Sequence, residues 1–288
     1  MAVRPYTGRV TTTDTAPPEE EQAGSPRPQS LLLTFFGLHV LGRDVAVYSG
    51  SVIEVLARVG VSEEAVRATL TRMVRRDLLA RHRRGRRMYF GLTARSREVL
   101  RDGRDRVWAG AVNRDWDGTW TLVGFSLPEA WRRQRHDLRT RLVWAGFGPL
   151  QNGLWIAPGR VEVPKVVAGL GLDDHLNVLG AHAAEPTEAA QLVRRAFDTA
   201  GIAARYLAFL DRWDRPEPAS GVPDDFTRRL LLHHDWLDLV RSDPRLPAEH
   251  LPPDWPAIRA DHVFRTLSHR FESGEGAGVA LDTIPAST

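Results

Sequence analysis

The stretch from Val61 to Thr93, VSEEAVRATLTRMVRRDLLARHRRGRRMYFGLT, constrains the fold of this chain more than any other. Serine favours the position just before a helix, so Ser62 predicts a helix start, and Glu63 and Glu64 would stabilise the first turn. Apolar residues then recur at i, i+4, i+7 and i+8, which predicts one buried stripe on this helix. The stripe consists of Val66, Leu70, Met73 and Val74.

The segments on either side of this helix complete a motif. SGSVIEVLARVG predicts a preceding helix that ends at Gly60, joined to the next helix by a tight turn. Two short segments around Arg84-Gly85 follow, in which Met88 and Phe90 alternate with Tyr89, as in a β-hairpin. Two helices joined by a tight turn and followed by a hairpin predict a winged helix-turn-helix.

Further helices flank this motif. QSLLLTFFGLHVLGR predicts a first helix with Ser30 near its N-terminal cap. On the other side, Thr93 is expected to cap a helix over ARSREVLRDGRDRVW that leads out of the domain.

Charge is unevenly distributed, although the net charge is only +3. Nine arginines and a single acidic residue, Asp77, lie between Arg67 and Arg87. Residues 27–108 hold 17 basic and 8 acidic side chains (+9), whereas residues 1–26 hold 2 and 4 (−2) and residues 109–288 hold 20 and 24 (−4). A basic segment joined to a mildly acidic remainder indicates that residues 27–108 bind a polyanion.

The position of the arginines favours double-stranded DNA as that polyanion. They fall on the outer side of the predicted second helix of the motif and at the predicted wing, where winged helices contact the major groove and the backbone. The alternatives are a merely solvated face, or a single-strand binder, for which Tyr89 and Phe90 are too few aromatic residues. The expected DNA-binding residues are Arg67, Thr71, Arg72, Arg75, Arg83, Arg84, Arg86 and Arg87.

The rest of the chain divides into four parts. Residues 1–26 are rich in Pro, Thr and Glu and are expected to be a disordered tail before the domain at 27–108. Residues 109–185 predict a middle domain of order βαββαβ, which gives a ferredoxin-like α+β unit. Residues 186–274 predict a helical C-terminal domain, and residues 275–288 a loose tail.

Three stretches resemble the PaaX family of phenylacetate-pathway repressors. They are AVRATLTRMVRRDLL, WDGTWTLVGFSLPEAWRRQRHDLRTRLVWAGFGPLQNGLWIAP and LLLHHDWLDLVRSDPRLPAEHLPPDWP, and the similarity spans roughly residues 27–272. The resemblance implies a winged helix, a Cas2-like middle domain and a helical C-terminal domain. It also implies a homodimeric repressor that binds operator DNA and is released by an aryl-CoA thioester such as phenylacetyl-CoA. A PaaX-like regulator of another pathway, with another effector, is the first alternative.

One residue departs from the family pattern. Family members commonly carry Asp at the end of the first middle-domain strand, where this chain has Ser126 in FSLP. Cas2-like nucleases use an acid there to hold a metal ion, so Ser126 argues against a metal-dependent nuclease, the second alternative. Asp117 and Asp137 lie nearby in sequence without forming a cluster.

No sequence motif indicates an enzyme or a resident cofactor. Phosphate-binding glycine loops, HExxH and GxSxG patterns are missing. His234 and Asp238 have the i, i+4 spacing of a metal pair, but one His and one Asp on a helix are more often a polar face. The chain has no cysteine, no apolar run of membrane-spanning length and no signal-like N-terminus, so a cytoplasmic protein is expected. An effector pocket is expected where the middle and C-terminal domains meet, with an arginine beside a hydrophobic cleft.

Overall fold

The structure is a computed structural model that describes residues 27–241, 243–274 and 280–286. The segment 1–26, for which the sequence predicts disorder, lies outside the described residues. Among the residues described, no helix combines the length and the apolarity that crossing a membrane requires.

The N-terminal part packs helices against a small sheet. Its elements are α1 (Pro28–His39), β1 (Val45–Tyr48), α2 (Ser49–Ala57), α3 (Glu63–Arg75), β2 (Leu79–Arg84), β3 (Arg87–Leu92) and α4 (Ala94–Trp108). Ser62 and Thr93 cap α3 and α4 as predicted, since their hydroxyl oxygens accept from the backbone N–H of Ala65 and Ser96, each at 3.2 Å.

The predicted first helix begins near Ser30, but Ser30 itself is not the cap. α1 begins at Pro28, whose fixed φ suits the first helical position, and Arg27 occupies the cap position without a side-chain hydrogen bond. The Ser30 hydroxyl lies inside the first turn, 3.4 Å from Nδ1 of His234.

The sheet of this part has the order β2-β3-β1-β8. β8 (Thr283–Pro285) pairs antiparallel with β1, so the expectation of a loose tail is wrong for these three residues. The predicted alternation in the hairpin is also wrong at Tyr89, which is buried like Phe90. Tyr48, from the strand beside β3, covers the Tyr89 ring with 5.6 Å between ring centroids.

The middle part is an antiparallel sheet with two helices. Its elements are β4 (Trp120–Phe125), α5 (Arg132–Trp144), β5 (Gly148–Gln151), β6 (Leu154–Pro158), α6 (Val163–Val167), η1 (Asp173–His175) and β7 (Leu176–Ala181). The element order is the predicted βαββαβ, and the sheet order is β5-β6-β4-β7. Val123 on β4 and Leu138 and Leu142 on α5 are fully buried in a core between the sheet and the helix.

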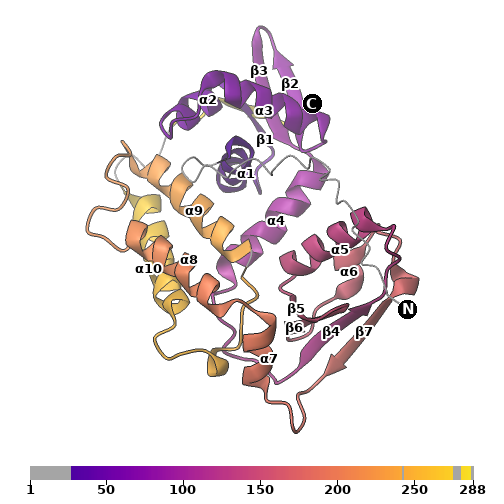
Figure 1. Cartoon of the computed structure of the whole chain (residues 1–288). Coiled ribbons are helices and arrows are strands. Elements are labelled where there is room, and N and C mark those ends of the chain that lie inside the picture. Colours follow the sequence, from indigo (N-terminus) through magenta and orange to yellow (C-terminus); the bar gives the residue numbers. More distant parts are fainter. Residues whose placement is uncertain (1–26, 242, 275–279, 287–288) are drawn as a thin grey trace, which may run out of the picture.

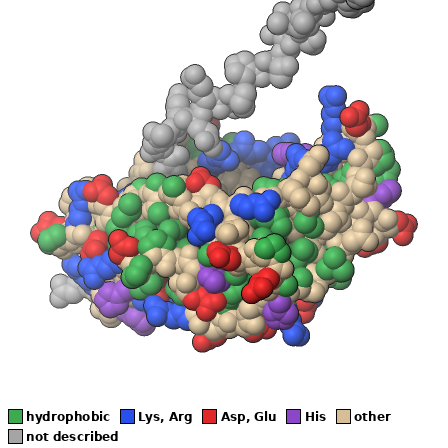
Figure 2. All heavy atoms as spheres, turned by 60° about the horizontal axis from the view of Figure 1, so that its bottom comes forward, with side chains coloured by type: hydrophobic (Ala, Val, Ile, Leu, Met, Phe, Trp, Pro, Cys, Tyr) green, Lys and Arg blue, Asp and Glu red, His purple; other side chains and the backbone are tan. Residues whose placement is uncertain are grey.

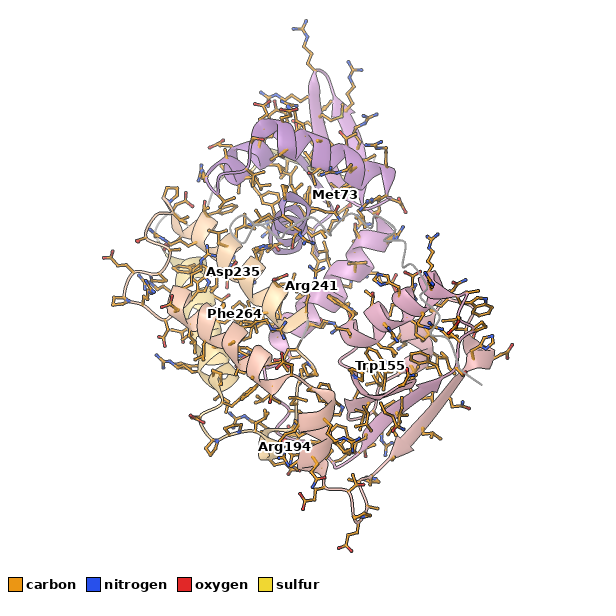
Figure 3. The ribbon with its side chains drawn as sticks, viewed as in Figure 1. Met73, Trp155, Arg194, Asp235, Arg241 and Phe264 are labelled. Carbon is orange, nitrogen blue, oxygen red and sulfur yellow. The ribbon has the colours of Figure 1, made fainter. Side chains whose placement is uncertain are left out.

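The C-terminal part is helical. It contains α7 (Ala189–Ala196), α8 (Thr199–Trp213), α9 (Asp225–Arg241), η2 (Ala248–His250) and α10 (Pro256–Ser273). Trp236 on α9 stacks on Phe264 of α10 at 4.7 Å between centroids, and Phe264, labelled among the C-terminal helices in Figure 3, is fully buried. Trp236 Nε1 also donates to the carbonyl of Val107 on α4 at 3.1 Å.

One apolar core joins the N-terminal and C-terminal parts. The same buried cluster contains Leu32 and Phe36 of α1 as well as Leu230 and Trp236 of α9. α9 lies against both α1 and α4, and in Figure 1 it runs between these helices and α8. The helices around α3 are therefore packed directly on the C-terminal helices.

Candidate nucleic-acid interface

The outer face of α3 carries the first group of expected DNA-binding residues. Val66, Leu70 and Met73 are buried, and Figure 3 shows Met73 on the inner side of the helix. Because the helix buries that stripe, Arg67, Thr71, Arg72 and Arg75 are left exposed. The four side chains line one shallow cleft, which Glu63, Glu64 and Ala68 complete.

Short contacts hold this face of α3 in place. Arg67 forms an exposed ion pair with Glu63 at 2.7 Å, one turn back. The Thr71 hydroxyl donates to the carbonyl of Arg67 at 2.9 Å, and Arg72 donates to the Thr69 hydroxyl at 2.9 Å. Exposed pairs of this kind contribute about 0–1 kcal/mol, so the guanidinium groups can exchange them for contacts to a polyanion at little cost.

The β2–β3 hairpin carries the second group. Arg84 and Arg87 face each other across the last register pair, and Gly85, with φ +60°, makes the turn with Arg86. A positive φ favours glycine at that position. Arg83 Nε donates to the Gly85 carbonyl at 3.0 Å. The hairpin projects beyond α3 at the top of Figure 1, so its tip arginines reach past the helix.

A second cleft of about 490 Å³ connects α3 with the hairpin. Arg67 and Arg75 line it from α3, and Arg81 lines it from β2. Its apolar part is formed by Leu70, Val74, Met88 and Phe90. Arg81 is not among the residues that the sequence predicted to bind DNA. The alternation of strand side chains could have indicated it, because Arg81 and Arg83 share one face of β2.

The arginines differ in how their charge is balanced. Arg87 pairs with Asp282 at 2.7 Å and lies over the Tyr48 ring, 5.2 Å from its centroid. For Arg75, Arg84 and Arg86, no carboxylate lies within ion-pairing distance in the part of the chain that the structure describes. These three guanidinium groups therefore offer a net positive charge on the helix and at the hairpin tip.

One other face of the molecule lacks this bias. Figure 2 shows the face at the bottom of Figure 1, where acidic and basic side chains alternate with hydrophobic ones. Mixed signs of charge are typical of a solvated surface and give no field of one sign.

Of the residues considered for metal binding, His234 and Asp238 line one cleft at α9, whereas Asp117 and Ser126 lie in the middle part. Within residues 27–241, 243–274 and 280–286, no group of three or more His, Asp or Glu side chains could hold a metal ion. Asp117 accepts the backbone N–H of Thr119 at 2.9 Å and so stabilises its own turn, and Ser126 is exposed after β4. His234 is buried, and burial lowers its pKa.

Comparisons with known proteins agree on one family. Residues 27–96 match the family described as PaaX-like protein, residues 113–193 match the PaaX protein central Cas2-like domain, and residues 197–277 match the PaaX-like protein C-terminal domain. The transcriptional repressor PaaX of Escherichia coli (strain K12) is 28% identical over 254 residues, which cover 83% of this chain and 77% of that protein.

A solved structure has the same fold. The uncharacterized protein Rv0674 from Mycobacterium tuberculosis superposes with a TM-score of 0.57 at 22% identity, covering 85% of this chain and 95% of that one. The three matched segments span the N-terminal, middle and C-terminal parts described above. The chain therefore belongs to the PaaX family.

Proposed function

We propose that this protein is a transcriptional repressor that binds operator DNA through a winged helix-turn-helix formed by α2, α3 and the β2–β3 hairpin. The observation that carries the proposal is the arginine surface formed by two clefts that extend from α3 to Arg81 of β2, together with the arginines at the hairpin tip. The similarity to a protein named as a transcriptional repressor supports the same conclusion. Its site of action would be chromosomal DNA in the cytoplasm, and no catalytic step is needed.

The dimensions of α3 suit the major groove. A helix of 13 residues is about 20 Å long, and a groove about 12 Å wide admits one α-helix. In that position Arg67, Thr71, Arg72 and Arg75 would face base edges and flanking phosphates. Arginine offers two parallel donors to guanine, and each good pair of this kind contributes about 1–3 kcal/mol of discrimination.

The hairpin would contact the DNA backbone beside the groove. Arg83, Arg84, Arg86 and Arg87 are clustered at its tip, where a wing meets phosphates. Phosphate contacts position a protein without reading sequence, so these residues would contribute affinity and salt dependence. A homodimer would present two copies of α3 to half-sites one or more helical turns apart.

The cleft between the middle and C-terminal parts is our candidate for the effector. It has a volume of about 600 Å³ and lies between α5, α8 and α9. Trp144 lines it from α5, and the guanidinium of Arg241 lies 5.1 Å from the centroid of the Trp144 ring. Figure 3 shows Arg241 at the end of α9 that faces the middle part. Arg205 and Arg212 line the cleft from α8, where Arg212 pairs with Asp235 at 2.9 Å.

An aryl-CoA thioester such as phenylacetyl-CoA has the chemistry that this cleft can bind. Its phosphates would pair with the arginines, and its flat or apolar groups would pack against Trp144, Val143 and Phe209. An effector that prefers another placement of α9 would weaken DNA binding by the same factor by which DNA weakens effector binding. The coupling free energy between two such sites is typically about 1–3 kcal/mol. A regulator with a different small-molecule effector would use the same cleft for another anion.

The test is a titration of labelled promoter DNA with the protein, followed by phenylacetyl-CoA or free CoA. We expect phenylacetyl-CoA to displace the protein and free CoA to do so more weakly. Arg241→Ala should weaken the response to the thioester but not DNA binding, whereas Arg270→Ala, an exposed arginine on α10, is the matched control. An Arg241→Ala protein that responds like the wild type would contradict the proposal that the effector binds in this cleft.

A further inference from the structure

A smaller cleft lies on another face of α9, between the N-terminal and C-terminal parts. It has a volume of about 280 Å³ and is enclosed by α1, α4 and α9. It shares no lining residue with the candidate effector cleft. Six of its thirteen lining residues are aliphatic, namely Leu33, Leu38, Leu41, Leu100, Val107 and Leu237.

Two helical glycines keep this cleft open. Gly37 lies in α1 and Gly103 in α4, and both line the cleft. Neither has a positive φ, and an added Cβ would meet only Leu100 at 3.7 Å or Leu237 at 3.9 Å, which are ordinary contacts. Glycine inside a helix costs about 1 kcal/mol relative to alanine, and close packing does not require it here. The visible consequence of the two glycines is the free volume between the helices.

A cationic side chain with an unused donor lines the same cleft. Arg229 of α9 donates through one terminal nitrogen to Glu272 at 2.8 Å. Its Nε is buried and has no hydrogen-bond partner among the described residues. Leaving a buried donor without an acceptor costs about 1–3 kcal/mol, and more when the group is charged. An anionic oxygen bound in the cleft could accept a hydrogen bond from the guanidinium of Arg229, whose side chain is 22% exposed.

The neighbouring histidine adds no charge of its own. Burial, and secondarily the charge of Arg229, lower the pKa of His233 to about 3, so the ring is neutral at physiological pH. It is held by the Ser268 hydroxyl at 2.9 Å. The polar character of the cleft is therefore cationic, from Arg229 and from Arg104 at its edge.

We propose that this cleft binds a compact hydrophobic carboxylic acid, with its ring or branched alkyl body among the leucines and its carboxylate on Arg229. A volume of about 280 Å³ is at the lower end of ligand pockets, which suits a single-ring acid and excludes a whole nucleotide-bearing thioester. The Trp108 ring, 41% exposed at the cleft, would be covered by such a ligand.

The site is placed to influence DNA binding, a step that rests on the proposed function. α1 packs against α3, and α4 continues from the β2–β3 hairpin, so a ligand between these helices and α9 touches the supports of the arginine surface. If the ligand alters their packing on α9, DNA affinity changes with occupancy.

The direct test measures ligand binding to the full chain without DNA, by ligand-observed NMR and by calorimetry. The probes are benzoate and cyclohexanecarboxylate, with benzyl alcohol as the neutral control. We expect both acids to bind and the alcohol to bind at least about tenfold more weakly, since a hydrogen bond to a charged group contributes about 1.5–3 kcal/mol. No binding of either acid at millimolar concentration, or equal binding of the alcohol, would overturn the proposal.

Variants that fill the cleft show whether the acid binds in this cleft or elsewhere on the protein. Gly103→Leu should weaken acid binding at least about tenfold, because the leucine side chain would occupy volume that the body of the acid needs. Gly103→Ala, which raises helix propensity without filling the volume, should bind like the wild type. Gly37→Leu repeats the test from the opposite wall if Gly103→Leu fails to fold. Wild-type affinity in a folded filled variant would contradict the proposal.

A parallel DNA-binding experiment distinguishes a failure of this inference from a failure of the proposed function. Promoter DNA is titrated with wild type and Gly103→Leu, each with and without the acid that binds. A wild-type protein that binds the acid but no DNA would refute the proposed function and leave the ligand site standing. A protein that binds DNA but no acid would refute the ligand site alone.

Discussion

The ion pair between Arg87 and Asp282 gives a prediction that can be worked out from the structure. Asp282 comes just before β8 and places a carboxylate 2.7 Å from the guanidinium of Arg87, beside the hairpin tip. Its side chain also accepts from the Tyr89 hydroxyl at 3.3 Å. Asp282→Asn removes the negative charge and keeps the shape. The backbone bonds, Tyr48 N–H to the Asp282 carbonyl and Asp282 N–H to the Ser51 hydroxyl, do not depend on that charge.

Two effects of this substitution have different magnitudes. The Arg87 and Asp282 side chains are 61% and 36% exposed, so solvent screens the pair and its loss should change the free energy of unfolding little. A phosphate bound by Arg87 would lie about 7 Å from the carboxylate, where repulsion in water is about 0.6 kcal/mol. Affinity for DNA should therefore rise about threefold at low salt, and the salt dependence should become steeper because added salt screens this repulsion and removes the gain.

Fluorescence anisotropy of promoter DNA at four salt concentrations measures both quantities. Asp254→Asn, the same charge change at an exposed site of the C-terminal part, is the control and should leave the logarithmic salt slope unchanged. Urea unfolding of each variant reports the change in stability. An Asp282→Asn protein with the slope and affinity of the control would refute a role for Arg87 in binding phosphate.

Three further predictions concern the arginine surface and one buried histidine. Arg67→Ala or Arg72→Ala should weaken binding to the preferred DNA by about 1–3 kcal/mol and relax base preference, measured by competition with base-substituted sites. Arg84→Ala or Arg86→Ala should instead weaken binding to all sequences alike and flatten the salt slope by about 0.9; a loss confined to one sequence would make the hairpin a base reader. Burial lowers the pKa of His39 from 6.5 to about 4, so the imidazole binds a proton more readily in the unfolded chain than in the folded protein. His39 should therefore contribute a fall of about 1.4 kcal/mol in the free energy of unfolding for each pH unit between about 6.5 and 4. Urea titrations of His39→Phe should show a slope smaller than that of the wild type by this amount, because His233 keeps a pH dependence of its own.

Local signals explain why part of the candidate site was predictable. α3 was found from Ser62, its two acidic neighbours and a buried stripe, all within one helix. The exposed face that carries Arg72 and Arg75 then follows from helical spacing alone. The middle part was found from strands and helices separated by glycines in turns, such as Gly146 with φ +84°.

Features that depend on distant segments were not predictable. β1 has four residues and β8 three, too short for a reliable alternation, and β8 is fixed by its pairing with β1. The burial of Tyr89 depends on Tyr48 and Asp282, which lie on other strands or beyond them.

The two clefts of α9 illustrate the same limit. The neighbouring residues His233 and His234 line different clefts because side chains one position apart on a helix point about 100° apart. The partners of α9 come from α1, α4, α5 and α8, so the clefts exist only once these helices are packed. The sequence indicated a junction with arginines but neither cleft's lining.

The most direct test of the account is an anisotropy titration of the protein against promoter DNA from beside its own gene and against a shuffled sequence, at two salt concentrations. The account predicts tight binding to the promoter DNA that persists at the higher salt, and much weaker binding to the shuffled sequence. Equal, weak binding to both sequences that vanishes at the higher salt would contradict it, because the arginines would then form an electrostatic surface that reads no operator.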